Sequence, residues 1–87
     1  METTNTVVIN YCGGWGYRSK AQAAKAIIEA AYPGKFTYDL VKDAGATGRL
    51  EVVVKGTTVH SKAGGEGFVT DANKQKMLDR IASLMDD

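Results

Sequence analysis

The chain has 87 residues, of which 44% are hydrophobic and 24% charged, and its formal net charge is +1. This length predicts one small domain, residues 1–87, and the balanced charge argues against a general nucleic-acid-binding protein. The start of the chain lacks the regions of a signal peptide, and no apolar run approaches the roughly 18 residues of a membrane span. The single cysteine excludes an intrachain disulfide, and a free thiol fits the cytoplasm. We therefore expect a monomeric cytoplasmic protein with a flexible segment at residues 1–5.

The first two elements are a strand and a helix. Residues 6–11 (TVVINY) are rich in β-branched side chains and bounded by turn residues, which predicts a strand, and the three consecutive aliphatic residues favour burial on both of its faces. Residues 19–32 carry an apolar stripe at helical spacing. Ser19 and Gln22 have the spacing of a capping box, which predicts that this helix begins at Ser19. Pro33 and the glycine after it end the helix.

Three strands and two loops follow. Residues 35–42 alternate apolar and polar side chains, which predicts a half-buried strand, and residues 43–48 (DAGATG) form a loop. Residues 49–55 and 57–61 are predicted to be two strands of a hairpin, because only a short glycine-containing turn separates them. Residues 62–69 form a glycine-rich loop.

A final helix follows Thr70 or Asp71, either of which is a suitable N-cap. The β-α-β-β-β-α order predicts a parallel first pair of strands with a right-handed crossover, and a hairpin that extends the sheet. We therefore expect an α/β (α+β) fold of the thioredoxin-like type, with a four-stranded mixed sheet of order 2-1-3-4 covered by two helices. The apolar face of the final helix consists of Met77, Leu78, Ile81, Leu84 and Met85.

This topology gathers three loops around Cys12. The first strand ends at Cys12, and the loops 43–48 and 62–69 are predicted to reach the same edge of the sheet, as is His60 at the end of the fourth strand. Ligands of open α/β sheets bind at this carboxyl edge. The edge around Cys12 is therefore the candidate functional site.

Three stretches of the chain carry a resemblance to a known family: VVINYCGGWGYRSK, TGRLEVVVKGTTVHSK and GEGFVTD. Together they resemble the thioredoxin-like Rdx family of selenoprotein W over nearly the whole chain. The resemblance implies an antioxidant redox protein with a Cys-x-x-selenocysteine motif, or Cys-x-x-Cys in some members. It also implies glutathione as the reductant and partner proteins such as 14-3-3 proteins. Cys12 falls on the cysteine of the motif, and Trp15 falls on the selenocysteine position.

Trp15 is a departure from the family motif. An indole neither ionises to a nucleophile nor bonds to sulfur, so the two-centre chemistry is expected to be lost. Cys12 then forms only mixed disulfides, for example with glutathione, or is oxidised to a sulfenic acid. Trp15 has three candidate origins: a natural tryptophan, a UGA selenocysteine codon read as tryptophan, or a deliberate substitution. The codon at position 15 distinguishes the decoding origin, since UGA and UGG differ by one base.

Cys12 has a functional and a structural interpretation. It is either a reactive thiol or an inert buried cysteine at the end of a strand. The resemblance favours the thiol, and the surrounding glycines favour its exposure because they provide no side chains to cover it. Trp15, if natural, would be an exposed platform for a partner. The glycines, which also permit a tight turn and close approach of glutathione or a partner backbone, are Gly13, Gly14 and Gly16.

Four basic or titratable residues are candidate contacts for glutathione or a partner. Arg18 and Lys20 follow the cysteine loop, and Lys62 follows the last strand. His60 could stabilise a thiolate, but an edge-strand histidine that faces solvent is the favoured interpretation. One histidine and one cysteine argue against a metal site. The alternative function is a redox-inactive or monothiol adapter that binds proteins through the Cys12 loop and the Gly64–Val69 loop.

Overall fold

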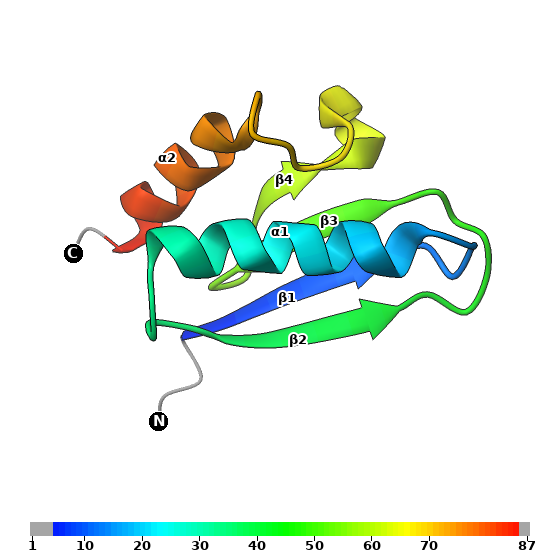
Figure 1. The fold of residues 1–87 in the computed structure, drawn as a ribbon, viewed down its shortest axis with the longest axis horizontal. Helices are drawn as coiled ribbons and strands as arrows, with labels where there is room; N and C mark the ends of the chain where they lie inside the picture. Colours follow the sequence, from blue (N-terminus) through cyan, green and yellow to red (C-terminus); the bar gives the residue numbers. More distant parts are fainter. Residues whose placement is uncertain (1–4, 86–87) are drawn as a thin grey trace.

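The computed structural model describes residues 5–85, so the predicted flexible segment 1–5 lies outside the described residues except for Asn5. The sheet has the order β2-β1-β3-β4, with β1 parallel to β2 and the other two neighbouring pairs antiparallel (Figure 1). This confirms the predicted mixed sheet and the thioredoxin-like arrangement. The elements are β1 (Thr6–Tyr11), α1 (Tyr17–Ala31), β2 (Thr37–Lys42), β3 (Leu50–Val54), β4 (Thr57–Ser61), the short π-helical turn η2 (Lys62–Glu66) and α2 (Lys74–Met85).

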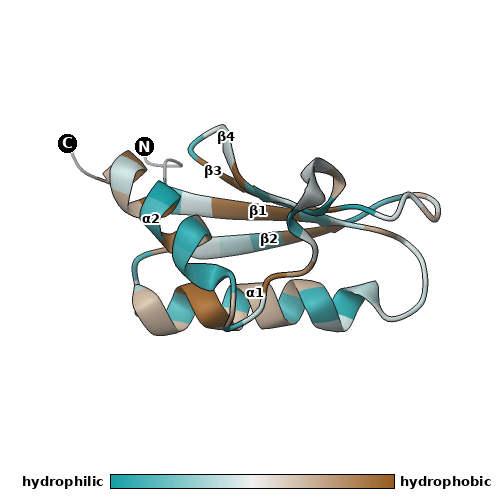
Figure 2. Ribbon diagram, turned by 90° about the horizontal axis from the view of Figure 1, so that it is seen from above, coloured by the Kyte–Doolittle hydropathy of each residue, from teal (hydrophilic) through white to brown (hydrophobic). Residues whose placement is uncertain are grey.

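Both helices lie on the same side of the sheet, and the core lies between them and the strands (Figure 2). Side chains along β1 and β3 alternate between buried and half-buried, as expected when only one face is covered. The prediction that β1 is buried on both faces was therefore wrong, because Val8 points to the other face and is half-buried. The largest fully buried side chains are Val7, Ile9, Ile28, Leu50, Val52, Val54, Val59, Met77 and Ile81.

The helix α1 begins at Tyr17, two residues before the predicted start. Gly16 is its N-cap, with a φ of 89° that favours glycine, and no side chain caps the helix. The predicted capping box at Ser19 was wrong: the Ser19 hydroxyl donates a hydrogen bond of 2.9 Å to the carbonyl of Gly16 instead of accepting one from the backbone. The earlier start brings the positive end of the helix closer to Cys12.

The helix α2 begins at Lys74, after a turn that Thr70 and Asn73 close together. The Asn73 carboxamide oxygen accepts from the Thr70 amide at 2.8 Å, and the Thr70 hydroxyl accepts from the Asn73 amide at 3.3 Å. Thr70, one of the two predicted caps, thus makes reciprocal capping hydrogen bonds with Asn73 in the turn that leads into α2. The β3–β4 hairpin is confirmed, and both turn residues, Lys55 and Gly56, have the positive φ that a type I′ turn requires.

The turn 12–16 and the loop 43–49 lie side by side beyond the carboxyl ends of β1 and β2 (Figure 1). The Asp43 amide donates to the carbonyl of Tyr11 at 2.8 Å, and the Gly13 amide donates to the carbonyl of Gly45 at 2.9 Å. The segment after β4 reaches this end through Phe68, whose ring packs edge-on against Tyr17 with centroids 5.3 Å apart. The predicted convergence is confirmed for the Cys12 turn and the loop 43–48, whereas the loop 62–69 reaches this end at Gly48 and Tyr17, through the side chains of Lys62 and Phe68.

Candidate functional site

Cys12 lies directly after β1 and is only 3% exposed. Its amide donates to the carbonyl of Arg49 at 2.8 Å, which fixes the residue against the start of β3. The prediction of an exposed thiol was therefore wrong. The glycines leave no side chains over the sulfur, but the backbone of the neighbouring turn and loop packs over it instead.

Hydrogen-bond donors surround the sulfur. The Gly14 amide donates to Cys12 Sγ at 3.2 Å. Burial raises the pKa of Cys12, but the neighbouring backbone amides of Gly48, Gly14 and Thr47 outweigh it, so the pKa lies below its ordinary value. The Thr47 amide also donates to the carbonyl of Gly45 at 3.0 Å, so it is shared between two acceptors. The site favours the thiolate, which is the nucleophilic form of cysteine.

An ion pair ties the two ends of the loop 43–49 together. Arg49 donates from Nε and Nη2 to the two carboxylate oxygens of Asp43, each at 2.8 Å. The Thr47 hydroxyl donates to the same carboxylate at 2.5 Å. The hydrogen bonds from Arg49 and Thr47 lower the pKa of Asp43 to about 2, so the carboxylate is charged at neutral pH. Asp43 and Thr47 were not predicted as site residues, and the only sequence signal was that an acid and a base bracket the loop.

A pocket of about 280 Å³ lies beside the thiol turn, and Cys12 is one of its lining residues. Trp15 lies at its margin and is fully exposed, so the indole covers neither Cys12 nor the sheet edge. Arg18 and Lys42 provide the charged side chains of the lining, and both are cationic. Arg18 was predicted as a contact, whereas Lys42 was not, because its place beside the thiol depends on the parallel pairing of Tyr11 with Lys42. The other lining residues are Tyr11, Cys12, Gly13, Gly14 and Gly16.

Lys20 and Lys62 lie at the border of this site rather than in the pocket. The Lys20 ammonium lies 5.2 Å from the centroid of the Phe68 ring, and that of Lys62 lies 5.4 Å from the same ring and 5.8 Å from Tyr17. Lys62 also donates to the carbonyl of Gly48 at 3.2 Å. Both lysines therefore help to hold the segment after β4 against the start of α1.

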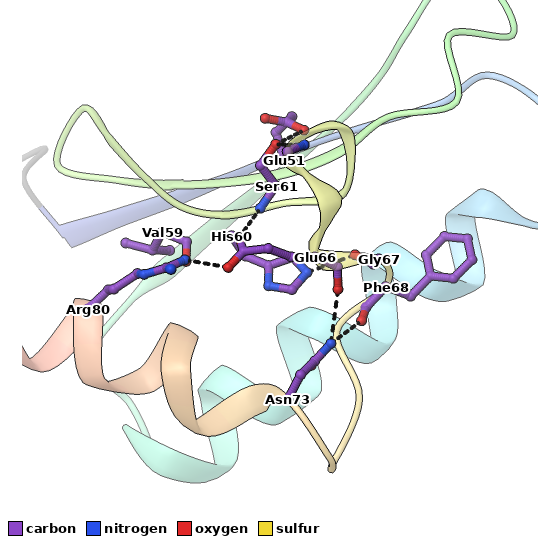
Figure 3. Close-up of polar contacts among 10 residues, drawn as sticks. Glu51, Val59, His60, Ser61, Glu66, Gly67, Phe68, Asn73 and Arg80 are labelled. Carbon is purple, nitrogen blue, oxygen red and sulfur yellow. Dashed lines mark hydrogen bonds and ion pairs between the residues drawn. The ribbon is translucent and has the colours of Figure 1, made fainter.

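His60 has neither of its two predicted environments. It is 2% exposed, so it does not face solvent, and it is not among the residues that line the pocket over Cys12. Its Nε2 lies 2.8 Å from the carbonyl oxygen of Gly67, within a hydrogen-bond network between β4 and α2 (Figure 3). The β-bulge between Val52 and Val53 explains the burial, since it breaks the alternation of β4 and turns both Val59 and His60 inward.

The β4–α2 network, defined as His60, Ser61, Glu66, Asn73 and Arg80, is a second polar cluster that sequence reasoning missed. Glu66 accepts from the Ser61 amide at 2.9 Å and from Arg80 at 2.8 Å, and these donors lower the pKa of Glu66. The Asn73 carboxamide donates to the carbonyls of Glu66 and Phe68 (Figure 3). Through these bonds the polar groups of the network hold the segment after β4 against β4 and α2.

Within residues 5–85, no group of three or more metal-binding side chains is brought together, and none of the helices there is both long and apolar enough for a membrane span.

A thiol at the turn between the first strand and first helix of a four-stranded mixed sheet defines a thioredoxin-like protein. The model of the Rdx family matches residues 6–80, and the chain belongs to the Rdx family. Selenoprotein W of Danio rerio is 40% identical over 83 residues, which cover 94% of this chain and 96% of that protein. Selenoprotein W of Sus scrofa is 40% identical over 78 residues, or 90% of this chain and 87% of that protein. Selenoprotein V of Homo sapiens is 36% identical over 84% of this chain, which corresponds to 21% of that longer protein. These similarities confirm the resemblance to the family.

Proposed function

We propose that this Rdx protein is a cytoplasmic thiol redox protein in which Cys12 exchanges disulfides with glutathione. The observation that carries the proposal is the buried Cys12 in the lining of a pocket, with the Gly14 amide donating to its sulfur and a lowered pKa. In such an exchange the Cys12 thiolate attacks a disulfide, forms a mixed disulfide and releases the other sulfur as a thiolate. Arg18 and Lys42, at the pocket wall, suit the carboxylates of glutathione.

Position 15 is proposed to be the second redox centre of the family motif. The similarity to proteins named as selenoproteins supports this assignment, as does the full exposure of Trp15, since a group that attacks an incoming substrate must be accessible to it. With tryptophan at this position the protein is limited to one-thiol chemistry. Oxidised Cys12 is then reduced only by an external thiol, which we propose is glutathione.

Replacement of Trp15 by cysteine tests this assignment. The Trp15→Cys variant should form an intramolecular disulfide with Cys12 and reduce a peroxide or disulfide substrate with glutathione faster than the Trp15 form does. The variant with both Trp15→Cys and Cys12→Ser is the control, and it should lose this gain. Equal turnover of the Trp15 form and the Trp15→Cys variant would refute a second redox centre at position 15.

A second candidate function is a protein-binding adapter, and the exposure of Trp15 favours it. A fully exposed tryptophan beside two cationic side chains is a suitable anchor for a partner with an acidic surface. 14-3-3 proteins are a proposed partner. Titration calorimetry with such a partner should show binding that is weakened by Trp15→Ala but retained in Cys12→Ser. Binding that is lost on alkylation of Cys12 and retained in Trp15→Ala would instead assign the partner to the thiol.

A further inference from the structure

The loop 43–49 is anchored on both sides of Cys12 by contacts that its own ends make. At one end the Asp43 amide bonds to the carbonyl of Tyr11, and at the other the carbonyl of Arg49 accepts from the Cys12 amide, both at 2.8 Å. The side chains of the same two residues form the two-point ion pair across the base of the loop. The residues that flank Cys12 in space are thus locked to each other.

The interior of the loop is set by the same carboxylate. It accepts from the Thr47 hydroxyl inside the loop. The neighbouring carbonyl of Gly45 accepts from the Gly13 amide at 2.9 Å, and the next amide along the turn, that of Gly14, donates to Cys12 Sγ at 3.2 Å. The Asp43 side chain itself is only 7% exposed, although the Arg49 side chain that bonds to it is 43% exposed. Removal of the carboxylate would leave both the Arg49 guanidinium and the Thr47 hydroxyl without their shared acceptor, and only the long 3.5 Å bond from the Arg49 amide would remain on the Thr47 hydroxyl oxygen.

We propose that Asp43 and Arg49 are positioning residues, whose ion pair holds the loop 43–49 against the thiol turn. The turn then keeps the Gly14 amide directed at Cys12 Sγ, where it stabilises the thiolate. The inference rests on the proposed function for its biological meaning, but it concerns the ionisation of Cys12 and not turnover. Neither residue needs to contact a substrate to act in this way.

Other charged and titratable groups also surround the thiol. Tyr11 and Lys42 belong to β1 and β2, and Arg18 projects from the first turn of α1. Lys62 reaches the carbonyl of Gly48 from η2. None of these side chains is itself substituted when the Asp43–Arg49 pair is changed, and of them only Lys62 is bonded to the loop 43–49. Any change in the ionisation of Cys12 then reports on the ion pair and the loop that it holds.

The direction in which the pKa of Cys12 moves distinguishes a positioning role of the two residues from a direct effect of their charges. Asp43→Asn removes a negative charge, so direct electrostatics alone would favour the thiolate and lower the pKa of Cys12. Arg49→Lys keeps the positive charge but not the planar two-point fork, so direct electrostatics alone would leave the pKa unchanged. Positioning predicts a raised pKa of Cys12 in both variants, because the loop loses its clamp in both.

The test is the rate of alkylation of Cys12 by iodoacetamide as a function of pH, in the full-length protein. The Cys12 proton goes to solvent, and Sγ then displaces iodide from the reagent. Asp43→Asn and Arg49→Lys should each shift the titration upward and slow alkylation at pH 7 by about threefold or more, with the same plateau at high pH. Arg80→Lys is the matched control, because Arg80 makes an ion pair with Glu66 at the same distance of 2.8 Å, and it should leave the titration in place.

An unchanged titration in Arg49→Lys, or a downward shift in Asp43→Asn, would overturn the proposal. If Asp43→Asn does not fold, Arg49→Lys decides alone, since it conserves charge. A shift of the same size in Arg80→Lys would show a general loss of structure and would also overturn the proposal. Absence of glutathione-dependent turnover would count against the proposed function while leaving this measurement valid.

Discussion

Two loops of this protein are each held by an arginine–carboxylate pair at 2.8 Å, and they differ in what the pair supports. The loop 43–49, closed by the Asp43–Arg49 pair, is bonded to the thiol turn, in which the Gly14 amide donates to Cys12 Sγ. In the β4–α2 network, Glu66 and Arg80 bind groups of the fold around them, such as the Ser61 amide and the carbonyl of Val59.

This difference shows why two similar ion pairs are expected to have different roles in function. Donors that are fully used by the fold contribute stability and shape, whereas donors left to face a titratable atom change its chemistry. His60 illustrates the first case, because its buried ring bonds to the carbonyl of Gly67 and lies outside the thiol pocket. Cys12 illustrates the second.

The largest effect is expected from Gly13→Ala, which breaks the contact between the thiol turn and the loop 43–49. A Cβ at Gly13 would lie 2.5 Å from the carbonyl oxygen of Asp43 and 3.0 Å from that of Gly45, so the backbone must move. We expect a loss of roughly 3 kcal/mol in the free energy of unfolding, measured by urea denaturation, and slower alkylation of Cys12. Gly45→Ala is the control, because its Cβ would meet open space. Equal stability of the two variants would show that the turn and loop are not tightly packed.

An intermediate effect is expected from Asn73→Ala, which disrupts the β4–α2 network instead. The variant loses the side-chain hydrogen bonds to the carbonyls of Glu66 and Phe68 and to the Thr70 amide. We expect the free energy of unfolding to fall by roughly 2 kcal/mol, while the pH dependence of Cys12 alkylation stays as in the parent protein. A raised pKa of Cys12 in this variant would remove the functional distinction between the two loops.

The smallest effect is expected in acid. The pKa of Asp43 is about 2 in the folded protein and 3.8 ordinarily, so the pair adds stability above pH 4 that is lost as the pH falls towards 2. Asp43→Asn should therefore be less stable than the parent protein at pH 7, and this difference in stability, called the gap below, should become smaller below pH 4. Thermal unfolding across this range measures the gap. A gap that is constant with pH would show that the carboxylate charge contributes nothing.

Much of the fold was accessible from local patterns. The β-branched run of β1, the apolar stripe of α1 and the glycine-containing hairpin each identified their element, because side-chain periodicity reflects the core face directly. The errors have local causes. Ser19 matched a capping box, but Gly16, with its positive φ, ended the preceding turn first. The burial of His60 depends on a bulge in the pairing of β3 and β4, which has no signature in the sequence.

The features of the candidate site likewise fall into those that the sequence predicts and those that depend on tertiary contacts. Family membership, the thiol of Cys12 and the absence of a second redox-active side chain at Trp15 follow from the order of residues alone, since they concern chemical identity. The burial of the thiol, the Asp43–Arg49 clamp, the place of Lys42 in the pocket wall and the donors from Thr47 and Gly48 do not. They arise from contacts between β1, β2 and β3 that join residues far apart in the chain, and a sulfur becomes a thiolate site only when such contacts bring donors to it.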